Sequence, residues 1–395
     1  MNTRKKLFFA CGIGLAAASA QAEVTFNGFA TLAGGSTLSD EDRLFGYDEK
    51  FDYENNSLLA LQASSDLGDG LSATAQVIAR GKDQWNAKLA WAYVGYELND
   101  NIKLIAGRQR MPFYVFSDYL DVSYAYHWIT PPEGSYALPF DSTNGIGAII
   151  TNQIGSADST LHIVTGRIKE DLELDQLREA DLSGMYSVAW TLNFSDFSLR
   201  AGYAQADLQY SIPEIEQALA SPDSNPVKDL VGGFALAGYD ITNELLANDD
   251  DNKGNFLGFG ATYDNGNWLA IAEYTEITVD HTTLPAEQVS YYFTLGKRFG
   301  DFTPHITVGA DENTPNSAFL DAMPTGNAQF EGLKQLAREN FFETDIAVTD
   351  NEYYTLGMRW DFHSSAAFKV DYTTHTANHL DKTNNLLRFA ISTVF

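Results

Sequence analysis

The chain of 395 residues has a single cysteine, at position 11, so a disulfide framework and a cysteine-ligated zinc or iron–sulfur site are both excluded. Basic residues are also few: 25 lysines and arginines stand against 53 aspartates and glutamates, for a formal net charge of −28. Nucleic acid is therefore not an expected partner, because phosphate binding needs a basic surface. After the N-terminal segment no stretch approaches about 18 apolar residues, which excludes a protein that crosses the membrane with helices.

The first 22 residues have the three parts of a secretory signal peptide. A basic start at residues 4–6 is followed by an apolar stretch to residue 18 and by the cleavage signal Ala20-Gln21-Ala22. We expect residues 1–22 to be removed on Sec-type export from a bacterial cytoplasm and residues 23–395 to form a single domain. Removal takes the net charge from −28 to −31 and leaves the mature chain without cysteine.

After residue 23 the dominant pattern is an alternation with period two. In residues 352–362, Tyr354, Leu356, Met358, Trp360 and Phe362 alternate with small, hydroxylated or charged residues. Such stretches run for about 9–12 residues, which is long for a soluble strand and right for a tilted strand across a bilayer. Aromatic residues near their ends indicate an interfacial girdle. The chain also ends on an aromatic residue within such a stretch.

This pattern predicts an all-β fold, a transmembrane antiparallel up-and-down β-barrel of about 16 strands. The number is even, as bacterial single-chain barrels require, and short turns alternate with long extracellular loops. The long loops include 35–56, 111–141, 209–255 and 312–350. The expected strands are 24–34, 57–66, 71–81, 85–98, 102–110, 142–151, 158–168, 181–194, 197–208, 256–264, 267–277, 287–299, 302–311, 351–363, 366–376 and 384–395.

Together, the leader, the sixteen strands, the terminal aromatic residue and the long loop after the fifth strand resemble the general porins of Gram-negative outer membranes, of the 16-stranded trimeric type. Gly107-Arg108-Gln109 is similar to the turn-in that precedes that loop in the family. The resemblance implies a homotrimer of water-filled pores in the outer membrane, with one loop folded into the lumen as a constriction. The expected partners are the lipid bilayer, lipopolysaccharide and small hydrophilic solutes.

A barrel of about sixteen strands leaves an aqueous channel, so function depends on the side chains at its narrowest point. Residues 111–141 are too rich in aromatic residues for a solvated outer loop, and we expect them to form the constriction. Their carboxylates, Asp118, Asp121, Glu133 and Asp141, would line it. The alternative is an outer loop packed on a trimer neighbour or on its own barrel rim.

We expect the opposing wall of the pore to be basic. An arginine that faces lipid at the bilayer centre costs about 2–4 kcal/mol, which favours a lumen position for the barrel arginines. By their distance from the turns, Arg200, Arg298 and Lys369 should lie low in the barrel. The main candidates are Arg108, Arg110 and Arg388 near mid-height, and Arg80 and Lys88 near a long-side loop.

The stretch 102–110 contains a local conflict. Leu104 and Ala106 share a strand face with Arg108 and Arg110. Either the arginines leave the ladder at a bulge, or small apolar residues turn inward there.

Opposed charges across a narrow wet pore create a transverse field that favours polar solutes. We therefore expect passive diffusion of ions and small hydrophilic solutes. The net charge and acidic loop runs such as 249–251 predict cation preference. Alternatively, the loop acids only solubilise the loops or bridge divalent ions to lipopolysaccharide, and selectivity follows the constriction alone.

A substrate-specific channel, for example for sugars, is the main rival. Its aromatic slide would come from Phe113, Tyr114, Phe116, Tyr119, Tyr124, Tyr126 and Trp128. An enzyme is not expected, because no Ser/His/Asp or paired-acid constellation lies at a predicted rim, and we expect no cofactor or metal. A receptor or adhesin would use the long loops, in which 212–230 and 328–342 have helical periodicity.

Overall fold

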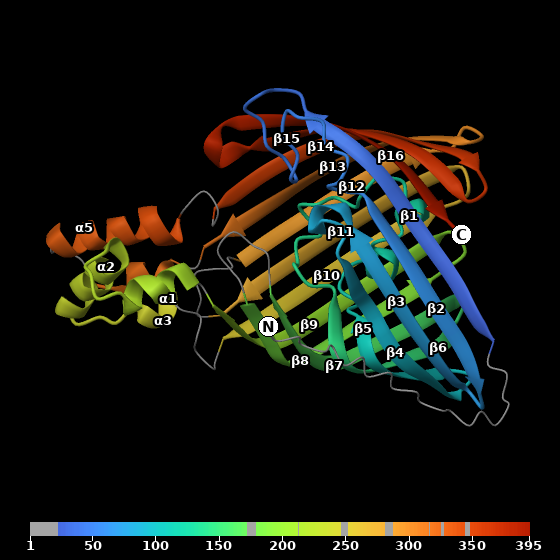
Figure 1. Cartoon of the computed structure of the whole chain (residues 1–395), viewed down its shortest axis with the longest axis horizontal. Coiled ribbons are helices and arrows are strands. Elements are labelled where there is room, and N and C mark those ends of the chain that lie inside the picture. The colour runs from blue at the N-terminus through green and yellow to red at the C-terminus, as the bar shows by residue number, and fades with distance from the viewer. Residues whose placement is uncertain are drawn as a thin grey trace, which may run out of the picture.

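The computed structural model describes residues 23–171, 179–211, 213–245, 252–280, 287–315, 317–324, 328–343 and 348–395. The predicted leader and the acidic run 249–251 lie outside the described residues. Within them, sixteen antiparallel strands form one closed barrel, in which each strand pairs with the next along the chain and β1 pairs with β16 (Figure 1).

The predicted strands are confirmed, with shifts of a few residues at their ends. They are β1 (Val24–Thr37), β2 (Leu58–Gly68), β3 (Leu71–Arg80), β4 (Ala87–Asn99), β5 (Ile102–Arg110), β6 (Ser142–Ile154), β7 (Ala157–Asp171), β8 (Glu179–Asn193), β9 (Phe197–Ser211), β10 (Lys253–Asp264), β11 (Trp268–Val279), β12 (Glu287–Lys297), β13 (Phe302–Thr314), β14 (Thr349–His363), β15 (Ala366–Ala377) and β16 (Lys382–Val394).

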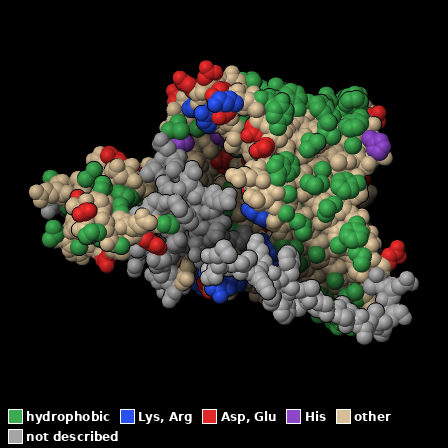
Figure 2. All heavy atoms as spheres, viewed as in Figure 1, with side chains coloured by type: hydrophobic (Ala, Val, Ile, Leu, Met, Phe, Trp, Pro, Cys, Tyr) green, Lys and Arg blue, Asp and Glu red, His purple; other side chains and the backbone are tan. Residues whose placement is uncertain are grey.

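The two faces of the strands differ as the alternation predicts. Along β15 every second residue is buried, including Lys369, Asp371 and Thr373. The opposite face of the neighbouring β14 exposes Leu356 and Trp360. Apolar side chains of this kind are spread over the outer surface of the barrel (Figure 2). The polar faces of the strands therefore turn toward the barrel interior.

The connectors also separate into two sets. Turns as short as 69–70, 100–101 and 364–365 join the strands at one end. The other end carries the longest connectors, but it is less uniform than predicted, because 81–86 and 378–381 are short as well.

Two of the long connectors fold into helices that pack together outside the barrel (Figure 1). The first gives α1 (Pro213–Ala220), α2 (Pro226–Leu236) and α3 (Thr242–Leu245), and the second gives α4 (Ala318–Ala322), α5 (Ala328–Ala337) and a π-helical turn at Arg338–Phe342. This confirms the two helical periodicities. The helices share a core of Leu230, Phe234, Ile241, Leu245, Leu320, Phe330, Ala337 and Phe342. None of the helices within the described residues is long and apolar enough to cross a membrane.

Candidate functional site

The connector between β5 and β6, residues 111–141, follows the polar faces of the strands. It leaves β5 at Arg110, at the barrel end that carries the long connectors. The hydroxyl of Tyr124 donates to the carbonyl oxygen of Ser364 at 2.8 Å, and Ser364 lies in a short turn at the other end. The segment forms two 3₁₀ turns on this path, Ser117–Tyr119 and Ser123–Ala125, and the second contains Tyr124. The segment therefore extends along the length of the barrel wall.

Aromatic side chains of the segment pack into that wall. Phe113 and Tyr114 join a buried cluster with Met185 of β8 and Phe256 of β10. A second cluster holds Phe116, Tyr126 and Trp128 against β11–β14, and the Trp128 indole N–H donates to Thr307 at 2.8 Å. Tyr119, in contrast, is 37% exposed. Most of the aromatic residues considered for a sugar slide are therefore used to attach the segment.

One predicted carboxylate, Asp121, lies between two predicted wall arginines. It accepts from Arg80 of β3 at 2.7 Å and from Arg110 of β5 at 2.5 Å. Arg110 also pairs with Asp141, and its guanidinium lies 5.1 Å from the centre of the Trp91 ring. Burial raises the pKa of Asp121, but the two guanidinium groups outweigh it and lower that pKa to about 2. The pair of charges is thus retained over the whole physiological pH range.

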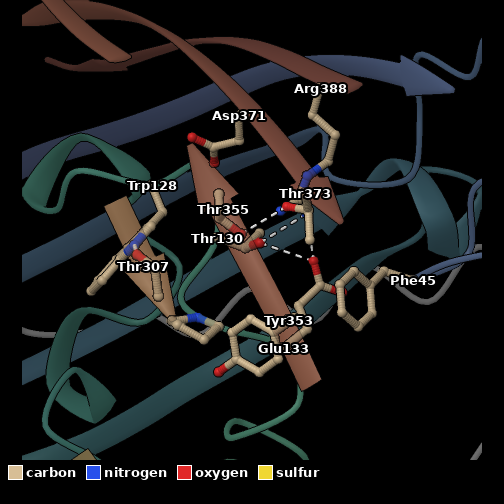
Figure 3. Close-up of a pocket in the computed structure, with 11 residues that line it drawn as sticks. Phe45, Trp128, Thr130, Glu133, Thr307, Tyr353, Thr355, Asp371, Thr373 and Arg388 are labelled. Atoms are coloured by element: carbon tan, nitrogen blue, oxygen red, sulfur yellow. Dashed lines mark hydrogen bonds and ion pairs between the residues drawn. The ribbon is translucent and has the colours of Figure 1, made fainter. Parts of the chain in front are cut away.

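A second pair joins Glu133 of the segment to Arg388 of β16 at 2.6 Å, and Thr130 also donates to Glu133, at 2.9 Å. These residues line a small pocket between the segment and the wall, together with Trp128, Asp371 and others (Figure 3). In Figure 3 the Arg388 side chain points down toward Thr130 and Glu133. Predicted acids and bases are therefore brought together as direct pairs.

The remaining predicted residues lie apart from these pairs. Asp118 is exposed, and no ion-pair partner for it exists among the described residues. Lys88 pairs with Asp83 in the connector 81–86 at 3.0 Å. Arg108 donates from Nε to the carbonyl oxygen of Ala90 at 3.2 Å.

The conflict in 102–110 centres on Gly107, because Leu104 before it is exposed and Arg110 after it is buried although the two residues share a strand face. Arg108 and Arg110 keep their places in the ladder with β6. In β4 the partners of β3 skip Ala90, whose carbonyl oxygen accepts from Arg108 and Ser142. Gly107 has φ of +133°, and a Cβ there would lie 2.3 Å from the Ala92 carbonyl oxygen. Glycine is thus required at the step before the arginines.

Sequence reasoning missed two acidic anchors on the wall. Glu273 of β11 is buried and accepts from the Val115 amide at 2.7 Å and from the hydroxyls of Tyr136 at 2.7 Å and Tyr292 at 2.9 Å. Asp371 of β15 accepts from the Ile129 amide at 2.8 Å. Their inward position on an alternating strand was a usable signal. In the part of the chain that the structure describes, no cluster of three metal-ligating acids, histidines or cysteines is present.

Comparison with known proteins identifies the class of molecule. Residues 10–391 match the model of the Gram-negative porin family. Among curated proteins, no relative matches the sequence. Solved structures are similar in fold: a loop L8 deletion mutant of OmpT, an outer membrane protein of Vibrio cholerae (12% identity, TM-score 0.56, 94% of this chain and 99% of that one), and Salmonella typhi OmpF in complex with daunomycin (13%, 0.55, 95% and 98%). An anion-selective porin from Comamonas acidovorans is also similar (12%, 0.54, 95% and 100%).

Proposed function

Because this chain belongs to the Gram-negative porin family, a family of outer-membrane channels, we propose that it forms a homotrimeric, water-filled pore for passive diffusion of ions and small hydrophilic solutes, with cation preference. The observation that carries the proposal is the path of residues 111–141 along the polar faces of the strands. In the proposal this segment folds into the lumen and sets the narrowest cross-section. A solved OmpT structure is described as a trimer form, which favours the same assembly here.

The membrane environment follows from the outer surface. Apolar side chains such as Leu356, Phe293 and Phe259 are about half exposed on the barrel. Contact with the acyl chains of the outer membrane and with neighbouring subunits would cover them. Lipopolysaccharide is the expected lipid partner at the end that carries the long connectors.

The charge distribution along the segment supports cation preference. Arg80, Arg110 and Arg388 each pair with a carboxylate, so their positive charge is largely offset. Asp118 is exposed and adds a negative charge that no described ion pair cancels. The acidic outer connectors add to this field. Similar solved structures do not supply the sign, because one of them is an anion-selective porin.

A sugar-specific channel is the weaker candidate. A slide needs several aromatic faces open to the solute, and five of the seven aromatic residues considered for it are buried in the wall. Saturation of the conductance by a sugar would favour this candidate. A channel requires no chemical turnover, and the absence of enzymatic activity stays a prediction.

Single-channel recording of the refolded mature protein in a planar bilayer, in a salt gradient, tests the proposal. We expect openings in steps of three and a reversal potential of the sign that cation preference gives. Asp118→Asn should move this potential toward zero, because it removes an exposed carboxylate. Asp223→Asn is the matched control, since Asp223 is an exposed acid between α1 and α2. An equal shift in both variants would contradict the assignment of selectivity to residues 111–141.

A further inference from the structure

Two cations lie directly opposite each other on neighbouring strands of the wall. Arg359 of β14 is the register partner of Lys369 of β15. Like charges in this position destabilise a sheet, and an ammonium that is fully buried is costly unless it is hydrogen-bonded. Lys369 has no exposed surface, so its surroundings must supply the compensation.

That compensation comes from the backbone of residues 123–128. The Lys369 ammonium donates to the carbonyl oxygens of Ser123, Tyr126 at 2.8 Å and Trp128 at 2.5 Å. It lies 4.9 Å from the centre of the Tyr126 ring as well. Three carbonyl oxygens thus converge on the one group that has three N–H donors on a single nitrogen.

Arg359 extends the same arrangement. Its guanidinium donates to the carbonyl oxygens of Tyr124 at 2.6 Å and Tyr126 at 2.8 Å, so the Tyr126 oxygen accepts from both cations. Asp361 binds the other side of the guanidinium at 2.7 Å. The backbone of 123–128 therefore bends around two fixed positive charges, and without them its carbonyl oxygens would be buried without donors.

We propose that Lys369, assisted by Arg359, is the positioning residue that fixes the 123–128 turn and thereby sets the bore of the pore. This rests on the proposed function, in which residues 111–141 form the constriction. Asp121 lies two residues before the turn, so displacement of the turn also moves the carboxylate that pairs with Arg80 and Arg110.

Chemical rescue tests the proposal in the complete trimer. Lys369→Ala removes an end group with the shape and charge of n-propylammonium. We expect loss of the single uniform conductance level, and its return when n-propylammonium chloride replaces part of the salt, each measured relative to wild type in the same solution. Tetramethylammonium, which has the charge but no N–H donor, should not restore it. Wild-type conductance in Lys369→Ala, or equal rescue by both cations, would overturn the proposal.

Two variants serve as controls. Lys369→Met fills the space of the side chain without a donor, so it should lose the uniform level and not respond to n-propylammonium. Lys297→Ala removes a cation of β12 that lies over the Trp268 and Phe299 rings, and it should behave as wild type. If Lys369→Ala refolds poorly, its refolding yield should rise with n-propylammonium and not with tetramethylammonium. A refolding yield that changes with neither n-propylammonium nor tetramethylammonium would count against the proposal.

A spin label separates this proposal from the proposed function. Tyr119→Cys in the mature protein, which has no other cysteine, places a single label on an exposed position of the segment. Lys369→Ala should make the label more mobile, and n-propylammonium should reverse this. If Lys369→Ala makes the label more mobile while the conductance stays uniform, Lys369 does fix the 123–128 turn, but residues 111–141 do not form the constriction. A label unaffected by Lys369→Ala would refute the anchor itself.

Discussion

Replacement of Asp121 by asparagine should change both the selectivity and the stability of the segment. The variant keeps the shape of the side chain but removes the charge between Arg80 and Arg110, at 2.7 and 2.5 Å. The Asp121 side chain is only 10% exposed. Loss of one partner of a buried ion pair costs about 3–5 kcal/mol, and we expect a value near the lower limit because Arg110 keeps Asp141.

The effect on selectivity follows from Coulomb's law. In water, one unit charge at about 7 Å changes the energy of an ion by about 0.6 kcal/mol, which separates a cation from an anion by about 1.2 kcal/mol. Unscreened, this lowers the ratio of cation to anion permeability about sevenfold. With a Debye length of about 10 Å in 0.1 M salt, the expected fall is about threefold, and in 1 M salt it should nearly vanish.

The ratio of cation to anion permeability is obtained from reversal potentials. These are measured with the same ratio of salt concentrations across the bilayer, at total concentrations from dilute to molar. Asp223→Asn, in the connector between α1 and α2, is the control for a change of one charge away from the segment. A ratio that does not change in dilute salt, or a change that persists in 1 M salt, would refute the placement of Asp121 beside the permeation path.

Two further predictions follow from the same contacts. The pKa of Asp121 is lowered to about 2, so the stability that its charged form contributes is present above the ordinary carboxyl pKa of about 3.9 and is lost as the pH falls from about 4 through 2. Thermal unfolding of wild type should therefore depend on pH in this window more steeply than that of Asp121→Asn, and parallel curves would contradict the ion pair. Gly107→Ala should reduce the refolding yield, measured by circular dichroism, because a Cβ would lie 2.3 Å from the Ala92 carbonyl oxygen, and an undiminished yield would contradict the strained backbone at that step.

The fold could be predicted almost completely, because each membrane-spanning strand can be recognised from the alternation in its own sequence. A face that meets lipid must be apolar at every second residue, so Leu356, Met358 and Trp360 identify β14 without any knowledge of its neighbours. The helices of the outer connectors also have a local signal, their periodicity. Their association does not: Phe234 of α2 packs on Phe330 of α5, and nothing in either stretch indicates the other.

The candidate site could be predicted only as far as residue types. The sequence offers the acids of 111–141 and the barrel arginines as candidates, but their pairing depends on closure of the barrel. Arg388 is 255 residues from Glu133, and Arg80 is 41 residues from Asp121. The expectation of acids facing bases across open water assumed that both remain hydrated. Packing of the aromatic residues against the wall brings the charges into contact instead.

This pairing has a consequence for how the segment is held. Carboxylates of the segment bind cations of the wall, as in Glu133 with Arg388, and carboxylates of the wall bind backbone amides of the segment, as in Asp371 with Ile129. Lys369 is a cation of the wall that pairs with no carboxylate of the segment. It binds carbonyl oxygens of the segment instead. Most charges in this contact therefore hold the segment against the wall, and because they are paired they contribute little to the field along the pore. A charge such as Asp118, which is exposed and holds nothing in place, can act on a passing ion at little structural cost, and for that reason selectivity should be easier to alter at Asp118 than at Asp121.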